Sequence, residues 1–184
     1  MQSVEAVQNP EQIGEIETLL KHHHGQLYAD VWRIGLNLSL RISDLLAIRY
    51  ADIDLDNRSY TLKEGKTGKT RHIRLNDAAL AVIQRRKKEY PDDIFLFQVH
   101  SNRAKGKPIR RETVSRAFKD VGERLGIRLG THSMRKTRGY IMHSNGVSLE
   151  MVAKVLNHSS PSVTMRYIGL EKEQVLQTYD EFVI

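Results

Sequence analysis

Cysteine is absent from this 184-residue chain, and so are long apolar runs. Without cysteine the chain can form no disulfide, no cysteine-ligated zinc centre and no thiol nucleophile. No stretch is apolar enough to span a bilayer and none resembles a signal peptide, so we expect a cytoplasmic protein with no membrane partner. Internal repeats and low-complexity segments are also missing, which leaves one globular domain long enough to bury a core.

Acidic residues are the minority among the charges. The chain has 29 Lys and Arg against 22 Asp and Glu, with a net charge of +7 and a pI near 9.7. This balance indicates a polyanionic partner, most simply nucleic acid, and therefore a nucleoid-associated location. The basic residues gather in two clusters, which predict a basic face, although a solvated face accounts for either cluster equally well. The residues expected to contact DNA are Lys69, Arg71, Arg103, Lys105, Lys107, Arg110 and Arg111.

Apolar residues recur at helical spacing over most of the chain, with one alternating stretch in the middle. The alternation predicts a small three-stranded antiparallel sheet within 53–75, with a hairpin turn at 65–68. Ser43 is expected to cap a short helix, and Thr131 to open a longer one. Together these elements indicate a mainly helical α+β domain over 1–170 and an amphipathic tail helix over 171–184. The other predicted helices cover 11–21, 26–39, 77–88, 111–125, 149–156 and the segment from 161 onward.

The most informative pattern is His132-Ser133-Met134-Arg135, followed by His158 and then Tyr167. A spacing of i, i+3 on a helix places His132 and Arg135 on one face. Arginine pairs bidentately with phosphate oxygens, histidine donates or relays a proton, and tyrosine can serve as an oxygen nucleophile. Together these residues describe a site that attacks a phosphodiester.

Two upstream segments and the HSMR segment itself resemble motifs of the tyrosine recombinases, also called phage integrases. The sequence LRISDLL resembles their first arginine box, with Arg41 as the catalytic arginine and Asp44 as its supporting acid. The sequence GKTGK resembles the hairpin that bears the catalytic lysine, which falls on Lys66. Lys69 is a competing choice, because only the hairpin register separates the two lysines. HSMR resembles the HxxR box of this family.

Two further segments continue the resemblance in the family's order. LNHSS resembles the LGHSS box, and MRY matches the nucleophile segment that ends at Tyr167. The resemblance covers about residues 8–170, and it implies the tyrosine-recombinase catalytic-domain fold and site-specific DNA recombination: integration, excision or inversion. The six catalytic positions that it implies are Arg41, Lys66, His132, Arg135, His158 and Tyr167.

The chemistry implied is cleavage and rejoining through a 3′-phosphotyrosine. Arg41 and Arg135 would clamp the non-bridging oxygens of the scissile phosphate. Tyr167 would attack phosphorus in line, with His132 as the base and His158 hydrogen-bonded to the phosphate. The catalytic lysine would protonate the departing 5′ oxygen. The bond energy is retained, so rejoining would need neither ATP nor a metal, and no cofactor is expected.

Each of these residues also has a purely structural interpretation. Arg41 could pair with Asp44 on a helix surface, and His132 could cap a helix or pack. His158 could favour a helix C-terminus, and Tyr167 could be a half-buried aromatic. Such coincidences would have to reproduce the family's order independently, so the catalytic interpretation is favoured.

The chain departs from the family pattern in several places without losing a catalytic group. Leu40, Lys136, Gly139 and Asn157 replace residues common in the family. Asn157 stands for glycine, which a left-handed backbone tolerates. The N-terminal core-binding domain of the family is expected to be missing from this chain. Without that clamp, affinity for DNA should be weak and strongly salt-dependent.

The resemblance also implies partners. We expect double-stranded DNA, a homotetramer assembled on it, a monomer or weak oligomer in its absence, and accessory DNA-bending proteins. The tail is expected to dock on a neighbouring protomer or, equally well, on its own domain.

Three other functions compete with recombination. Type IB topoisomerase-like relaxation uses the same chemistry without exchanging partners, and a DNA-binding regulator would carry an inert site. A metal nuclease built on the eight histidines lacks a carboxylate-rich site. His22 to His24 could hold a metal, but adjacent helical residues point in different directions, which favours an exposed turn.

Overall fold

The computed structural model describes residues 4–101, 104 and 106–169. A three-stranded antiparallel sheet consists of β1 (Ile53–Asp54), β2 (Ser59–Lys63) and β3 (Thr70–Arg74). A second, two-stranded sheet consists of β4 (Gln98–Val99) and β5 (Lys107–Pro108). The predicted mainly helical α+β class with its small sheet is confirmed. The described helices are α1 (Pro10–His24), α2 (Gln26–Leu38), α3 (Ile42–Leu46), the 3-10 helix η1 (Tyr50–Asp52), α4 (Asp77–Glu89), α5 (Arg111–Leu125), α6 (Ser133–Ser144), α7 (Leu149–Leu156) and α8 (Pro161–Ile168).

Side-chain caps determine where four of these helices begin. The side chains of Asn9, Asn76, Ser148 and Ser160 each accept a backbone N–H from the first turn that follows. Pro161 follows the last of these caps at a position where its missing N–H costs no helical hydrogen bond. The helix that carries Tyr167 therefore has a sharply defined start.

Three predicted details of the helices were wrong. His22 to His24 form the last turn of α1, because the chain leaves the helix only at Gly25, whose φ of 102° favours glycine. The short helix α3 begins directly after Arg41, so Ser43 lies inside it and does not cap it. Helix α6 begins at Ser133, after His132 rather than at Thr131.

The register of the sheet puts two charged residues beside its apolar face. β2 pairs antiparallel with β3, and Leu62 lies opposite Arg71. Tyr60, Leu62 and Glu64 alternate on the buried side, so the carboxylate of Glu64 continues an apolar row. Strands β4 and β5 were not predicted, since two-residue strands carry no readable alternation.

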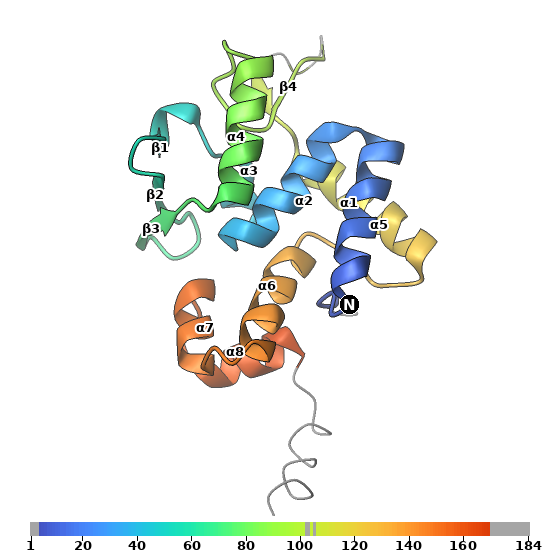
Figure 1. Cartoon of the computed structure of the whole chain (residues 1–184), viewed down its shortest axis with the longest axis vertical. Coiled ribbons are helices and arrows are strands. Elements are labelled where there is room, and N and C mark those ends of the chain that lie inside the picture. The colour runs from blue at the N-terminus through green and yellow to red at the C-terminus, as the bar shows by residue number, and fades with distance from the viewer. Residues whose placement is uncertain (1–3, 102–103, 105, 170–184) are drawn as a thin grey trace, which may run out of the picture.

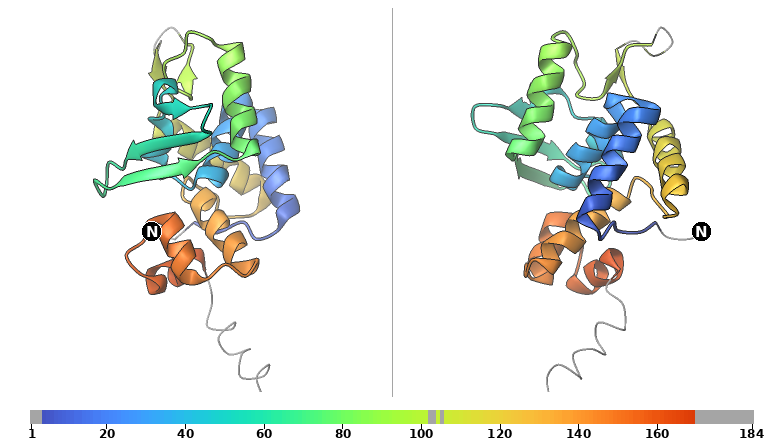
Figure 2. Two further views of the ribbon diagram at one scale, coloured as in Figure 1. Left: turned by 60° about the vertical axis from the view of Figure 1, so that its left-hand side comes forward. Right: turned by 45° about the vertical axis from the view of Figure 1, so that its right-hand side comes forward.

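The helices form two layers (Figure 1). In the upper layer, α1, α2, α4 and α5 pack around a core in which the rings of Trp32 and Phe118 meet edge to face. The sheet lies on one side of α2 and α4, with α5 on the other (Figure 2). The lower layer contains α6, α7 and α8, whose own small cluster consists of Val152, Leu156 and Ile168.

Candidate active site

Four of the predicted catalytic residues converge where the two layers meet. His132 precedes α6, Arg135 lies in its first turn, His158 follows α7, and Tyr167 lies near the end of α8. The Nδ1 atom of His132 is 3.2 Å from the hydroxyl oxygen of Tyr167. The rings of His158 and Tyr167 meet nearly at right angles, with their centroids 4.6 Å apart. Three separate helices thus bring two imidazoles to one phenol.

Arg135 is anchored to the backbone of both layers. It is 2% exposed and donates hydrogen bonds to the carbonyl oxygens of Ser39 and Leu156, the latter at 2.6 Å. Its positive charge also acts on Tyr167, where it offsets part of the rise in pKa that burial causes. Lys136, the next residue, places its ammonium 5.3 Å from the centre of the Tyr167 ring. The phenol therefore lies among cationic groups.

Arg41 joins this site through a different acid from the one predicted. Its Nη1 donates to Oε2 of Glu64 at 2.6 Å, whereas Asp44 accepts the backbone N–H of Gly65 at 3.1 Å. The alternative in which Arg41 pairs with Asp44 on a helix surface is wrong, because Arg41 lies in extended backbone before α3 and binds Glu64. The role of Asp44 as a supporting acid stays a prediction. Asp44 instead supports the base of the hairpin.

Glu64 is the residue that sequence reasoning missed. Its side chain is fully buried, and three donors besides Arg41 reach its carboxylate. Arg71 donates at 2.9 Å, the Thr67 hydroxyl at 2.8 Å and the Asn157 amide at 2.5 Å. One carboxylate thus connects Arg41, the hairpin and the loop before His158. The available signal was its position, because a charged residue continues the buried alternation of β2.

The left-handed backbone predicted for Asn157 is confirmed. Its φ and ψ are both 50°, and it ends α7 with its backbone N–H turned back onto the helix. Asparagine tolerates this conformation and, unlike glycine, supplies the amide that reaches Glu64. The departure from the family glycine therefore adds a contact to the site.

The two candidate lysines occupy different parts of the hairpin. Lys66 occupies the turn between β2 and β3 and is exposed. Lys69 lies on the returning side, where its carbonyl accepts the backbone N–H of Glu64 at 2.9 Å. Neither ammonium has an ion-pair partner among the described residues. Thr67, beside Lys66, donates a hydrogen bond to Glu64, so the turn is connected to the buried carboxylate that also binds Arg41.

Burial and the nearby cations together lower the pKa values of the two histidines in the site. Burial, with help from Arg135 and Arg41, lowers the pKa of His158 to about 4. Partial burial and nearby cations, including Arg135 and Arg111, also lower the pKa of His132. Both imidazoles are neutral at pH 7 and can accept a proton.

Glu64 and Tyr167 shift in opposite senses. Burial raises the pKa of Tyr167, and the nearby Arg135 and Arg41 offset part of that rise. Burial alone would raise the pKa of Glu64 too, but hydrogen bonds from Arg71, Thr67, Asn157 and Arg41 outweigh it and lower the pKa to about 2. The phenol thus keeps its proton at neutral pH, while the carboxylate stays ionised.

The residues expected to contact DNA fall into three groups. Lys69, Lys107, Arg110 and Arg111 are exposed, and Arg111 lies close enough to His132 to affect its pKa. Arg71 does not project outward: its guanidinium binds Glu64 and donates to the carbonyl of Val155 at 2.7 Å. The remaining two, Arg103 and Lys105, lie outside the described residues, as does the predicted tail helix over 171–184.

The described residues contain neither a metal-binding cluster nor a membrane-spanning helix. Over 4–101, 104 and 106–169, no three histidine or carboxylate side chains gather in a geometry that could hold a metal ion. In the same residues, no helix combines the length and the apolar character needed to cross a membrane.

The chain is similar to known recombinases in sequence and in fold. It is 31% identical over 183 residues to the probable integrase/recombinase YoeC of Bacillus subtilis, covering 99% of this chain and 98% of YoeC. It is 29% identical over 128 residues to the tyrosine recombinase XerA of Pyrococcus furiosus, covering 70% of this chain and 45% of XerA. The chain therefore spans nearly all of YoeC but less than half of this XerA.

Solved structures share the fold at low sequence identity. The integrase of transposon Tn1549 in complex with a circular intermediate DNA matches with a TM-score of 0.74 and 19% identity, over 99% of this chain and 67% of that one. A lambda integrase dimer bound to a core site matches with a TM-score of 0.69 and 17% identity, over 91% and 49%. The phage integrase family model matches residues 11–174. The chain therefore belongs to the phage integrase family, the tyrosine recombinases, which are enzymes of site-specific DNA recombination.

Proposed function

We propose that this chain cleaves and rejoins DNA strands with Tyr167 as the nucleophile, forming a 3′-phosphotyrosine. The observation that carries the proposal is the convergence of one phenol with His132, His158 and Arg135, from three helices, beside Arg41. A phenol among cations is what attack on a phosphodiester requires, because negative charge develops on the phosphate oxygens during the reaction.

Arg41 and Arg135 are the proposed clamp for the scissile phosphate. Both guanidinium groups oppose the rise that burial causes in the pKa of Tyr167, so both act on the oxygen that attacks phosphorus. Each is held by partners that leave its orientation little freedom: Glu64 for Arg41, and backbone carbonyls for Arg135. Prior orientation avoids reorganisation when charge develops in the transition state.

His132 is the proposed general base. Its ring nitrogen lies 3.2 Å from the tyrosine hydroxyl, within reach of the proton that leaves as the oxygen attacks. The lowered pKa of His132 keeps the ring neutral and able to accept that proton. His158 is placed by its Nδ1 contact of 3.0 Å with Thr164, which leaves Nε2 for the phosphate.

The hairpin supplies the proposed acid for the leaving 5′ oxygen. Lys66 is favoured over Lys69, because its neighbour Thr67 hydrogen-bonds to the carboxylate that also holds Arg41. In the reaction, the Tyr167 oxygen forms a bond to phosphorus as the bond from phosphorus to the 5′ oxygen breaks. The proton on the ammonium passes to that oxygen, and the reverse sequence rejoins the strand.

Exchange of strands between two DNA sites would need several copies of the chain. We propose a homotetramer assembled on DNA and a monomer or weak oligomer in its absence, with the tail over 171–184 docking on a neighbouring protomer. Deleting the tail should then lower assembly on DNA while leaving single-site cleavage intact. Unchanged assembly would favour docking of the tail on its own domain.

Covalent trapping tests the proposed nucleophile. The protein is incubated in EDTA with a nicked duplex of its own attachment site and run on a denaturing gel. We expect a DNA-linked band that is lost in Tyr167→Phe and kept in Tyr140→Phe, a control that packs beside the same small cluster. Absence of the band despite measured DNA binding would favour an inert regulator.

A second assay separates recombination from relaxation. Supercoiled plasmids carrying one or two attachment sites are incubated with the protein, and their topology and connectivity are read on agarose gels. Exchange between two sites supports a recombinase. Relaxation without exchange would identify topoisomerase-like activity.

A further inference from the structure

A cavity of about 440 Å³ lies beside the candidate active site, against the outer edge of the sheet. β3 is the edge strand, and the cavity lies between it, the end of α2, α6 and α7, on the side of the molecule where β3 faces α7 (Figure 1). The described residues that line it are Asn37, Leu38, Arg71, His72, Ile73, Arg74, Arg138, Lys154 and Val155.

The lining of this cavity carries positive charge that is only partly compensated. Four of its side chains are cationic, namely Arg71, Arg74, Arg138 and Lys154, and none is a carboxylate. Arg71 has a partner, Glu64, outside the lining. Within the described residues, Arg74, Arg138 and Lys154 form no ion pair.

Arg138 is the least expected of these residues. It is half-buried, and its Nε is shielded from solvent without a hydrogen-bond partner among the described residues. Burial lowers the pKa of its guanidinium, and no neighbouring carboxylate opposes that effect. An unpaired charge in a half-buried position is costly unless an anion completes the site.

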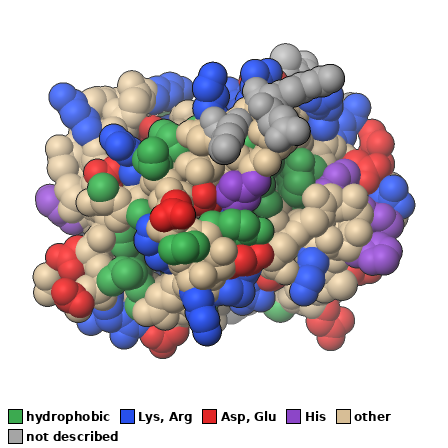
Figure 3. All heavy atoms as spheres, turned by 90° about the horizontal axis from the view of Figure 1, so that it is seen from above, with side chains coloured by type: hydrophobic (Ala, Val, Ile, Leu, Met, Phe, Trp, Pro, Cys, Tyr) green, Lys and Arg blue, Asp and Glu red, His purple; other side chains and the backbone are tan. Residues whose placement is uncertain are grey.

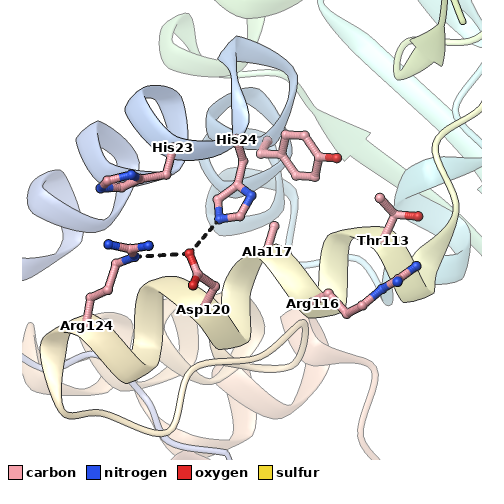
Figure 4. Close-up of a pocket in the computed structure, with 8 residues that line it drawn as sticks. His23, His24, Thr113, Arg116, Ala117, Asp120 and Arg124 are labelled. Carbon is pink, nitrogen blue, oxygen red and sulfur yellow. Dashed lines mark hydrogen bonds and ion pairs between the residues drawn. The ribbon is translucent and has the colours of Figure 1, made fainter.

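In a second cavity of the molecule, a carboxylate compensates the positive charge of the lining. Between α1 and α5, Asp120 is 2.9 Å from Nε2 of His24 and accepts from Nε of Arg124 at 3.1 Å (Figure 4). That cavity already contains the carboxylate that its cations need. The far end of the molecule, near α4, likewise mixes basic and acidic side chains over its surface (Figure 3).

We propose that the cavity between β3, α6 and α7 binds a phosphate group, with Arg138 and Lys154 as the main donors. Arginine forks and lysine ammonium groups are the residues proteins use for phosphate. Arg71 strengthens the field, but its guanidinium is already bound to Glu64 and Val155. Arg74 lies at the exposed rim. The phosphate can belong to a DNA backbone or to a small phosphorylated anion, and binding is independent of the proposed strand cleavage.

The first arm of the test uses inorganic pyrophosphate as the probe, titrated into the full chain by calorimetry at constant ionic strength. If a small anion is the ligand, Arg138→Gln and Lys154→Gln should each weaken binding at least about tenfold, as expected for a lost charge-assisted hydrogen bond. Arg116→Gln and Lys119→Gln remove the same charges on α5 and should change affinity less than about twofold. Lys154 is exposed, so its variant remains informative if Arg138→Gln folds poorly.

The second arm measures affinity for a DNA duplex as a function of NaCl concentration. If a backbone phosphate occupies the cavity, Lys154→Gln should reduce the slope of log affinity against log salt by about one relative to Lys119→Gln. A loss in the first arm alone assigns the site to a small anion, and a loss in the second arm assigns it to DNA. The proposal would be overturned if the cavity variants behaved like their α5 controls in both arms.

Discussion

Glu64 holds two guanidinium groups on one fully buried carboxylate, those of Arg41 and Arg71. Four donors compensate the burial of this charge: Arg41, Thr67 and Asn157 donate to Oε2, and Arg71 donates to Oε1. Removing the charge would leave Arg41 and Arg71 facing each other without compensation. The site therefore depends on an acid that takes no part in the proton transfers.

Replacing Glu64 with glutamine tests this dependence. We expect Glu64→Gln to lower the free energy of unfolding by about 3–5 kcal/mol, the usual cost of breaking a buried pair. Covalent trapping should fall as well, because Arg41 loses its orientation. Urea denaturation measures the first effect and gel trapping the second.

Glu123→Gln is the matched control, since Glu123 forms an exposed pair with Lys119. It should change stability by less than about 1 kcal/mol. Equal stability of the two variants would contradict the role assigned to Glu64.

His158 makes stability depend on pH. Its pKa is about 4 in the folded chain and about 6.5 when unfolded, so between these values the unfolded chain binds more protons. The free energy of unfolding should therefore fall as pH falls from about 6.5 to 4, and this contribution is complete above about 6.5.

We expect His158→Asn to flatten that loss when urea denaturation is repeated at several pH values. His22→Asn, at the exposed end of α1, is the control and should retain it. A steep decline that persists unchanged in His158→Asn would show that another group is responsible. Bound phosphate should raise the pKa of His158, because its negative charge offsets the positive charges of Arg135 and Arg41.

At the residue scale, the sequence predicted which groups have the chemistry but not all of their partners. The family motifs pointed to Arg41, Arg135, His158 and Tyr167, which the fold brings together or links, and their catalytic roles stay predictions. Asp44 was assigned as the supporting acid from the resemblance of LRISDLL to the family's arginine box, a local motif that does not extend to Glu64. Glu64 is 23 residues from Arg41, and only the folded hairpin brings them together.

Helix α8 is seated against α6 at a glycine. A Cβ atom added at Gly139 would lie 2.7 Å from Cγ2 of Ile168 and 2.9 Å from Cδ1 of Leu156. Both contacts belong to the small cluster under α8, which carries Tyr167. The departure at position 139 from the family's larger residue thus lets α8 approach α6 closely.

Gly139→Ala should consequently push α8 away from α6. We expect a loss of about 1–3 kcal/mol in the free energy of unfolding by urea, as for overpacked cores, together with weaker covalent trapping. Gly14→Ala is the control, because Gly14 lies in α1 with nothing near its missing Cβ. That change should raise stability by about 0.5–1 kcal/mol. A gain in both variants would contradict the close seating of α8.

At the element scale, apolar spacing predicted the longer helices, whereas single residues were poorer guides to where a helix starts or ends. Asn76, Ser148 and Ser160 each cap a predicted helix through a local hydrogen bond. Ser43, the predicted cap, lies inside α3. His22 to His24 were read as an exposed turn, yet His24 is ordered within α1 by a bond to Asp120, 96 residues away. A contact of that range leaves no local trace in the sequence.

The whole molecule divides into a large core and a small one. Among the described residues, three buried apolar side chains form the cluster of the lower layer, compared with the extensive core around Trp32 and Phe118. Local opening costs less where fewer apolar contacts are lost. The layer that carries the proposed nucleophile is thus expected to be the less stable one.

Hydrogen exchange by mass spectrometry should show this difference directly. Amides of α7 and α8 should exchange faster than those of α2 in the DNA-free chain. Binding to a DNA duplex should slow their exchange, because the phosphate contacts join the lower layer to the upper one. Equal protection of α8 and α2 without DNA would contradict the division.

Arg135 and Arg41, the proposed clamp for the scissile phosphate, differ in how their charges are compensated. Ser39 follows the last residue of α2 and Leu156 is the last residue of α7, so the carbonyl ends of two helices face the Arg135 guanidinium. A helix end carries about half a negative charge, spread over several carbonyls that cannot take up a proton. Carbonyl groups therefore hold Arg135 in place, and it forms no ion pair with a described carboxylate. Arg41, in contrast, is ion-paired with the carboxylate of Glu64. Most of the electrostatic attraction for an incoming phosphate should come from Arg135, and Arg41 should mainly determine how that phosphate is oriented.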